Sequence, residues 1–141
     1  MASESPLRSL QAYSQFIASV PDLFPGVRRS TLTLYSVSPR HLVVRGELEF
    51  ASGIRLRVAE RIDTARARMT WYSYAVLCGA EELYWYDPQP HSDDPSLAST
   101  FPHHKHVPPN IKRNRMPAPG ISFTRPNLPF VIREIEQIVL G

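Results

Sequence analysis

The sequence predicts an α+β fold, in which one face of an antiparallel meander of about five strands is covered by an N-terminal and a C-terminal helix. Apolar residues recur at helical spacing near both ends of the 141-residue chain. Between residues 30 and 87 the period changes to two, and turn signals separate the short runs. Packing both amphipathic helices on one face of the sheet is the simplest way to bury these apolar sides. We expect a single domain over residues 1–141.

The N-terminal helix is expected within residues 1–26. Its apolar stripe consists of Leu7, Leu10, Tyr13, Ile17 and Val20. Ser5 suits the N-cap and Pro6 suits the first turn, whereas Pro21 is expected to end the helix.

The antiparallel sheet is expected within residues 28–87. The predicted strands are residues 30–37, 41–50, 54–62, 68–78 and 81–87. In the run that begins at Ile54, apolar residues alternate with Arg55 and Arg57. This alternation predicts a sheet with one apolar face and one solvated face.

Residues 88–126 are expected to form a long loop, because nine of the fourteen prolines lie there among His and Ser. Loops of this length in a compact domain tend to be functional or mobile. The chain then returns to helical spacing over residues 127–140, and Asn127 suits the N-cap. The apolar stripes of the two helices could serve a homodimer as well as a core.

Composition restricts the setting of the protein. No apolar run approaches eighteen residues, so no membrane span and no membrane partner are expected. The first ten residues lack a basic segment followed by an apolar one, so no secretory signal is expected. Cys78 is the only cysteine, which indicates a reducing compartment. The predicted location is therefore the cytoplasm.

Positive charge is concentrated in two stretches of the sequence. Residues 28–68 hold nine arginines and four acidic residues, and residues 101–115 hold four basic residues and no acid. Arginine suits bidentate recognition of phosphate, so this pattern is typical of a nucleic-acid footprint. Arg55 and Arg57 are the candidates for substrate contact. An ordinary solvated strand face would show the same pattern, and charge alone leaves both interpretations open.

The segment FPHHKH, residues 101–106, holds three of the five histidines. Clustered imidazoles and an ammonium group could divide the proton transfers and charge stabilisation of RNA cleavage. In an extended segment, His104 and His106 share one side, and His103 and Lys105 share the other. The adjacent histidines would then point apart, which is unfavourable for a metal site. A metal site and a solvated loop without chemistry remain the alternatives.

Three kinds of side chain in the predicted sheet suit the same chemistry. Alternation places Glu60 on the apolar face, where a carboxylate needs a partner or a functional reason, unless a bulge turns it outward. Asp87 could orient a histidine or simply end its strand. Tyr72 and Tyr74 share a face and could position a substrate, although such residues more often pack on a sheet.

Four short motifs stand out together: YSY at 72–74, YD at 86–87, PH at 90–91 and TFPHHKH at 100–106. In this combination they resemble the TumE-like toxin family. The resemblance covers roughly residues 27–140, and it carries over Glu60, Tyr72, Tyr74, Tyr86, Asp87 and His91 as family positions. The family segment YDNAPHH is YDPQPHS here, where Pro88 stands for the asparagine and Ser92 for the second histidine. The resemblance implies the toxin of a type II toxin–antitoxin pair, with a DNA-binding antitoxin as its partner.

The leading hypothesis is a toxin that cleaves RNA without a metal or other cofactor. The predicted catalytic residues are His91, His103, His104, Lys105, His106, Glu60 and Asp87. The predicted substrate contacts are Tyr72, Tyr74, Tyr86, Arg55 and Arg57. Two other classes of protein stay open: a non-catalytic module that binds nucleic acid or the antitoxin, and a metal-dependent nuclease.

Overall fold

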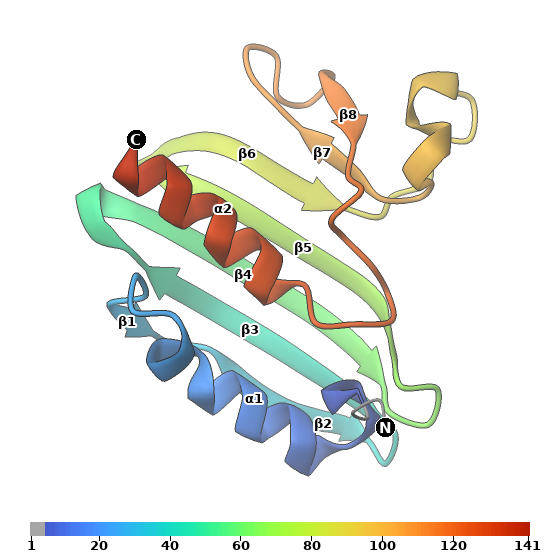
Figure 1. Cartoon of the computed structure of the whole chain (residues 1–141). Helices are drawn as coiled ribbons and strands as arrows, with labels where there is room; N and C mark the ends of the chain where they lie inside the picture. Colours follow the sequence, from blue (N-terminus) through green and yellow to red (C-terminus); the bar gives the residue numbers. More distant parts are fainter. Residues whose placement is uncertain (1–4) are drawn as a thin grey trace.

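The computed structural model describes residues 5–141 as one antiparallel sheet with two α-helices on the same face (Figure 1). This arrangement confirms the predicted α+β fold with both terminal helices on one side of the sheet. Residues 1–4 of the predicted N-terminal helix lie outside the described residues. Among residues 5–141, no helix is long and apolar enough to cross a membrane.

The N-terminal region contains two helical pieces where one helix was predicted. Ser5 caps the short 3-10 helix η1 (Pro6–Arg8), and α1 (Leu10–Leu23) begins after Ser9, whose Oγ accepts the Ala12 N–H at 3.0 Å. The prediction that Pro21 ends the helix was wrong, because α1 continues past it. A proline removes only one N–H donor, and in the last turn the helix loses little by it.

Within residues 5–141 the sheet has eight strands, compared with the predicted number of about five. They are β1 (Arg29–Ser30), β2 (Thr33–Ser38), β3 (His41–Glu49), β4 (Ile54–Asp63), β5 (Arg68–Cys78), β6 (Glu81–Asp87), β7 (His104–His106) and β8 (Arg115–Pro117). Their order is β1-β3-β4-β5-β6-β7-β8, and β2 also pairs with β3. The five predicted runs correspond to β2 through β6.

The segment predicted as a loop, residues 88–126, contains β7, β8 and the 3-10 helix η3 (Pro95–Thr100). Each of these two strands has three residues, which is too short to show the alternation that predicts a strand. In Figure 1 this part of the sheet lies at one end, beyond the edge of the helical layer. Thr100 ties the segment together, since its Oγ1 donates to His103 O at 2.7 Å and accepts from Ala118 N at 3.0 Å.

The core lies between the sheet and the two helices. The buried stripe of α2 (Leu128–Leu140) consists of Leu128, Val131, Ile132 and Ile135. The predicted N-cap Asn127 does not cap α2 with its side chain. Its amide is instead buried in the core, where Nδ2 donates to Tyr74 Oη at 3.2 Å and Oδ1 accepts from Ser122 N at 2.9 Å. Tertiary contacts at this position therefore override the capping preference.

Candidate functional site

Three side chains from β6 and β7 converge on the sheet face that carries no helix. Antiparallel pairing places Asp87 opposite His104 and Trp85 opposite His106. His104 Nε2 lies 3.0 Å from Asp87 Oδ1, and His106 Nε2 lies 3.2 Å from Asp87 Oδ2. The two Nε2 atoms are 3.0 Å apart. These three residues, which we call the Asp87 centre, come from two segments that the sequence separates by a proline-rich stretch.

The outer nitrogens of both imidazoles are held by backbone carbonyls. His104 Nδ1 lies 3.1 Å from Pro102 O, and His106 Nδ1 lies 2.9 Å from Ile111 O. A carbonyl oxygen only accepts hydrogen bonds, so each Nδ1 carries the proton. In the neutral rings, Nε2 is therefore an unprotonated acceptor directed at the carboxylate.

Asp87 is itself held in place by two N–H donors. Trp85 Nε1 donates to Oδ2 at 3.1 Å, and the backbone N–H of Gln89 donates to Oδ1 at 3.0 Å. Partial burial raises the pKa of Asp87, but the hydrogen bonds that protonated His104 and His106 rings would donate, together with the Gln89 N–H, outweigh it and hold the pKa well below its usual range. The carboxylate is thus ionised and fixed in orientation.

Two further predicted histidines lie beside the centre. The His91 ring meets the His104 ring edge to face, with centroids 4.8 Å apart. His103 points toward the helical face instead, where its Nδ1 hydrogen-bonds to Tyr72 Oη and its ring stacks on that tyrosine. Burial lowers the pKa of both histidines. His91 therefore borders the Asp87 centre directly, while His103 lies on the other side of β7.

Lys105 does not face the Asp87 centre. It lies opposite Tyr86 in the sheet, and its Nζ donates to Glu134 of α2 at 3.2 Å. The same Glu134 carboxylate accepts the Tyr86 hydroxyl at 2.9 Å. The alternation predicted for FPHHKH is confirmed, with His104 and His106 on one side and Lys105 on the other. Its consequence is that the lysine is placed away from the two histidines that it was predicted to assist.

Glu60 and the central tyrosines are buried among apolar residues. The exposed fraction of Glu60 is 0%, and the two tyrosine hydroxyls of Tyr13 and Tyr74 donate to it at 2.5 Å. Burial raises the pKa of Glu60 to about 7, although both hydrogen bonds act in the opposite direction. Glu60 therefore stays on the apolar face, where alternation placed it, and its partners are two tyrosine hydroxyls rather than a histidine. Tyr72 and Tyr74 are also fully buried, so neither is placed to stack on a base as predicted.

The predicted arginines share a sheet face with the Asp87 centre. Register partners run across the sheet from Arg57 through Ala75 and Trp85 to His106 and Arg115. Because register partners point to the same side, this row lies on the face without helices. Arg55 and Arg57 both contact Glu47, at 3.0 and 3.3 Å, and this pairing neutralises part of their charge.

Sequence reasoning missed three side chains of this face. Arg115 lies near His91 and His104, and its buried Nε has no hydrogen-bond partner among the described residues. Burial and the charge of Arg115 lower the pKa of His104, but its hydrogen bonds to Asp87 and Pro102 outweigh them, so this pKa is raised. Trp85 stacks on His106 with centroids 4.5 Å apart, and Trp71 remains partly exposed. Alternation could have shown both tryptophans opposite the buried tyrosines, and Arg115 ends the basic stretch 101–115.

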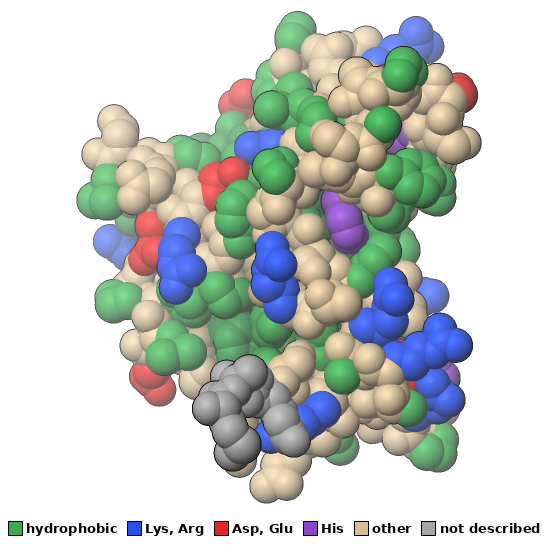
Figure 2. Space-filling view, turned by 45° about the vertical axis from the view of Figure 1, so that its right-hand side comes forward, with side chains coloured by type: hydrophobic (Ala, Val, Ile, Leu, Met, Phe, Trp, Pro, Cys, Tyr) green, Lys and Arg blue, Asp and Glu red, His purple; other side chains and the backbone are tan. Residues whose placement is uncertain are grey.

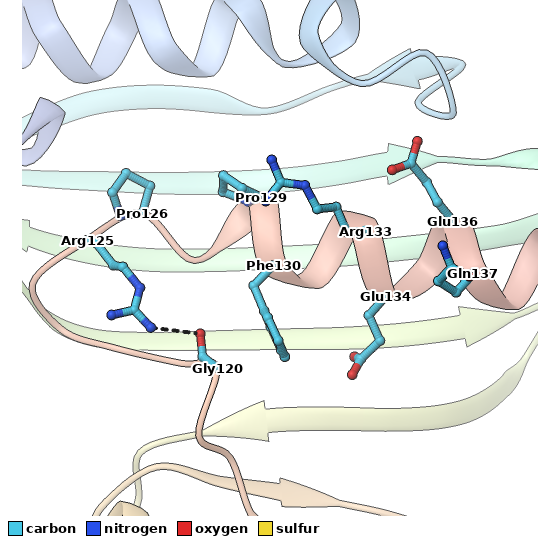
Figure 3. A pocket seen from close by; sticks show the side chains of 9 residues that line it. All are labelled: Gly120, Arg125, Pro126, Pro129, Phe130, Arg133, Glu134, Glu136 and Gln137. Carbon is cyan, nitrogen blue, oxygen red and sulfur yellow. Dashed lines mark hydrogen bonds between the residues drawn. The ribbon is translucent and has the colours of Figure 1, made fainter.

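A surface hollow on the helical side of the sheet is separate from the Asp87 centre. It has a volume of about 770 Å³ and is lined by residues of α2 and of the segment before it, including Phe130 and Arg125 (Figure 3). Gly120 forms its edge, where a Cβ would come within 2.2 Å of the Phe130 ring. None of the predicted site residues lines this hollow. In Figure 2, histidine side chains reach the surface elsewhere, with Lys and Arg side chains on the same side of the molecule.

The fold and the site together define a small α+β protein with a buried Asp–His–His centre at one end of an arginine-bearing sheet face. A family model described as Toxin TumE matches residues 15–139. The chain therefore belongs to the TumE toxin family, which confirms the resemblance seen in the sequence motifs. No curated protein and no solved structure matched the chain in the two other comparisons.

Proposed function

We propose that this chain acts as the toxin of a type II toxin–antitoxin pair by cleaving RNA at the Asp87 centre. Membership of the TumE toxin family supports the toxin role. The observation that carries the cleavage proposal is the convergence of His104 and His106 on one carboxylate, on the face that also bears Arg57 and Arg115. Proton-exchanging groups beside cationic ones are what phosphodiester cleavage requires.

The sheet face that carries no helix suits a single-stranded RNA substrate. Trp71 is 38% exposed, and the Arg61 guanidinium lies 5.6 Å from the centroid of its ring. The small side chains of Ala59 and Ala75 lie between the arginine and tryptophan side chains of this face, so they leave room for a ligand against the sheet. Aromatic rings that stack on bases and arginines that track phosphates are the usual elements of such surfaces.

In the proposed reaction, the ribose 2′-oxygen attacks the adjacent phosphorus and the bond to the 5′-oxygen breaks. A base of the site takes the 2′-proton, and the leaving 5′-oxygen receives a proton from an acid. His91 is the partly exposed imidazole beside the centre and is placed to exchange one of these protons. Arg115 takes the charge-stabilising role that the sequence gave to Lys105, since it lies on the same face as His106.

The antitoxin is the second partner that family membership supports. We propose a DNA-binding antitoxin that inhibits the toxin by covering its substrate face. Growth arrest on expression of the toxin, relieved by co-expression of the antitoxin, would support this pairing. Unimpaired growth with full-length, folded protein in the cell would argue against the toxin role.

The test of cleavage is an assay with untagged protein and labelled single-stranded RNA. We compare the wild type with Asp87→Asn and with His41→Gln, in which the one histidine distant in sequence from the cluster is changed. We expect Asp87→Asn to lower the rate by at least about 100-fold and His41→Gln to leave it unchanged. Intact RNA with wild-type protein, or full activity of a folded Asp87→Asn variant, would overturn the proposal. RNA bound without cleavage, and lost at high salt, would favour a non-catalytic binding module.

A further inference from the structure

We infer that Asp87, His104 and His106 bind one divalent first-row transition-metal ion, with zinc as the representative. Each residue offers one ligand atom, and no two of these atoms are more than 4.8 Å apart. The expectation from the sequence was metal-independent cleavage, based on adjacent histidines that point apart. The structure gives a different pair, His104 and His106, which the strand brings to one side.

The hydrogen bonds of the two imidazole rings leave both inner nitrogens as acceptors. Both Nδ1 protons are committed to backbone carbonyls, so both Nε2 lone pairs point inward to the carboxylate. Without a cation, a proton on one Nε2 supplies a donor for that ring alone, and the contact between the other Nε2 and the carboxylate, at 3.0 or 3.2 Å, still joins two acceptors. Protonating both rings would set two N–H groups against each other at 3.0 Å. One divalent ion satisfies all three acceptors at once.

The spacing of the ligand atoms agrees with this ion. Tetrahedral coordination at about 2.1 Å places ligand atoms about 3.4 Å apart. The two Nε2 atoms are 3.0 Å apart, and each contacts a different oxygen of Asp87, at 3.0 and 3.2 Å. With one carboxylate oxygen as the ligand, all ligand atoms lie within 4.8 Å, so side-chain shifts of about an ångström suffice to admit the metal. Two imidazoles and one carboxylate suit zinc, manganese or iron(II), whereas magnesium prefers an all-oxygen environment.

The surroundings have the features of metal sites. Metal-bound histidines usually donate their other ring N–H to a carbonyl or carboxylate, as both rings do here. The ligating carboxylate is in turn held by Trp85 Nε1 and by the Gln89 N–H. Three protein ligands leave a coordination position for water or for a phosphate oxygen. A hollow of about 250 Å³ lies next to His91, which borders His104.

A metal at this place would polarise the scissile phosphate or activate the attacking oxygen. That role in cleavage rests on the proposed function, but binding of the metal does not. The nearby Arg115 adds positive charge that opposes a cation, and it also suits the phosphate of a metal-bound substrate. These residues therefore best support a metal ion with a free coordination position, which could serve hydrolysis or transesterification of a phosphodiester.

The first experiment measures metal binding without RNA. Untagged protein is stripped with chelator, dialysed and titrated with Zn²⁺, and in parallel with Mn²⁺ and Mg²⁺, by calorimetry. We expect one Zn²⁺ per chain, and at least about 100-fold weaker binding by Asp87→Asn. Cobalt(II) should show absorption bands of nitrogen and oxygen coordination that the variant lacks. Absence of saturable Zn²⁺ or Mn²⁺ binding by folded wild-type protein would overturn the inference, as would wild-type affinity in Asp87→Asn.

A matched pair of variants tests the site even if Asp87→Asn fails to fold. Trp85→Phe removes the N–H that holds the carboxylate but keeps a ring over His106, whereas Trp71→Phe makes the same change away from the centre. We expect about tenfold weaker Zn²⁺ binding in Trp85→Phe and no change in Trp71→Phe. Equal Zn²⁺ affinities of the two variants would contradict a metal bound by the carboxylate that Trp85 holds. Stoichiometric metal with no RNA cleavage would leave the metal site standing and overturn only the proposed function.

Discussion

Replacing Glu60 by Gln should remove a pH dependence of stability that this buried carboxyl imposes on the fold. The side chain is fully buried between the hydroxyls of Tyr13 and Tyr74, and its pKa in the folded protein is about 7 compared with an ordinary value of 4.5. The raised pKa means that folding favours the protonated acid. Stability from this group is therefore fully present below about pH 4.5 and is lost as the pH rises through about 7.

The magnitude follows from the two pKa values. At 1.36 kcal/mol per pKa unit, the difference between 4.5 and about 7 corresponds to about 3 kcal/mol. Burial raises the pKa of the Tyr13 and Tyr74 hydroxyls above their ordinary value of 10.0, so neither neighbour titrates in this window. Asp63, whose pKa is lowered to about 2, acts in the opposite sense and only at lower pH. Glutamine keeps the shape of the side chain but has no proton to lose.

The assay is urea unfolding of the wild type and of Glu60→Gln at pH 5, 6, 7 and 8, with exposed Glu82→Gln as the matched control. Because part of the effect lies below pH 5, we expect the free energy of unfolding of Glu60→Gln to gain about 2–3 kcal/mol on that of the wild type between pH 5 and pH 8. Histidine titration affects both proteins and cancels in the difference. Parallel pH profiles for wild type and Glu60→Gln would refute the reasoning, because the buried carboxyl would then not change its charge on unfolding.

Three further predictions concern other parts of the molecule. Gly120→Ala should destabilise the fold by about 1 kcal/mol or less in urea unfolding, because the new Cβ meets at 2.2 Å the outer ring atoms of Phe130, an exposed side chain that can turn aside, and the same change should cost nothing in a Phe130→Ala background. Lys105→Met should leave the RNA cleavage rate unchanged and Arg115→Met should lower it at least about tenfold, since only the arginine shares the face of the centre. Trp71→Ala should weaken the binding of single-stranded RNA by about 1–3 kcal/mol in a fluorescence titration, without changing Zn²⁺ binding.

The sequence anticipated the sheet faces better than the site. Alternation correctly placed Glu60 inward and separated His104 and His106 from Lys105, because successive residues of a strand point to opposite faces. It could not show that Glu60 finds its partners in two tyrosine hydroxyls, one of them on α1. Those bonds depend on how the helix docks, which no local pattern encodes.

The Asp87 centre was only partly predictable for a related reason. Each of its three residues was named as a candidate from the sequence, but as one among seven catalytic positions. The structure places Lys105 and Glu60 away from this centre, although by residue type they are equally suited to catalysis. Residue type is a local property, whereas proximity is set by strand pairing over long distances in the chain.

The sequence by itself determined the α+β class, the two helices, the central strands and the family, since these follow from apolar period, turn residues and short motifs. Only the tertiary structure decided that the proline-rich segment returns to the sheet as β7 and β8. That pairing places Asp87 opposite His104 and commits the outer nitrogens of both histidines to backbone carbonyls. The physical reason is that a three-residue strand has no pattern of its own and forms only because an existing edge, β6, offers its unpaired N–H and C=O groups.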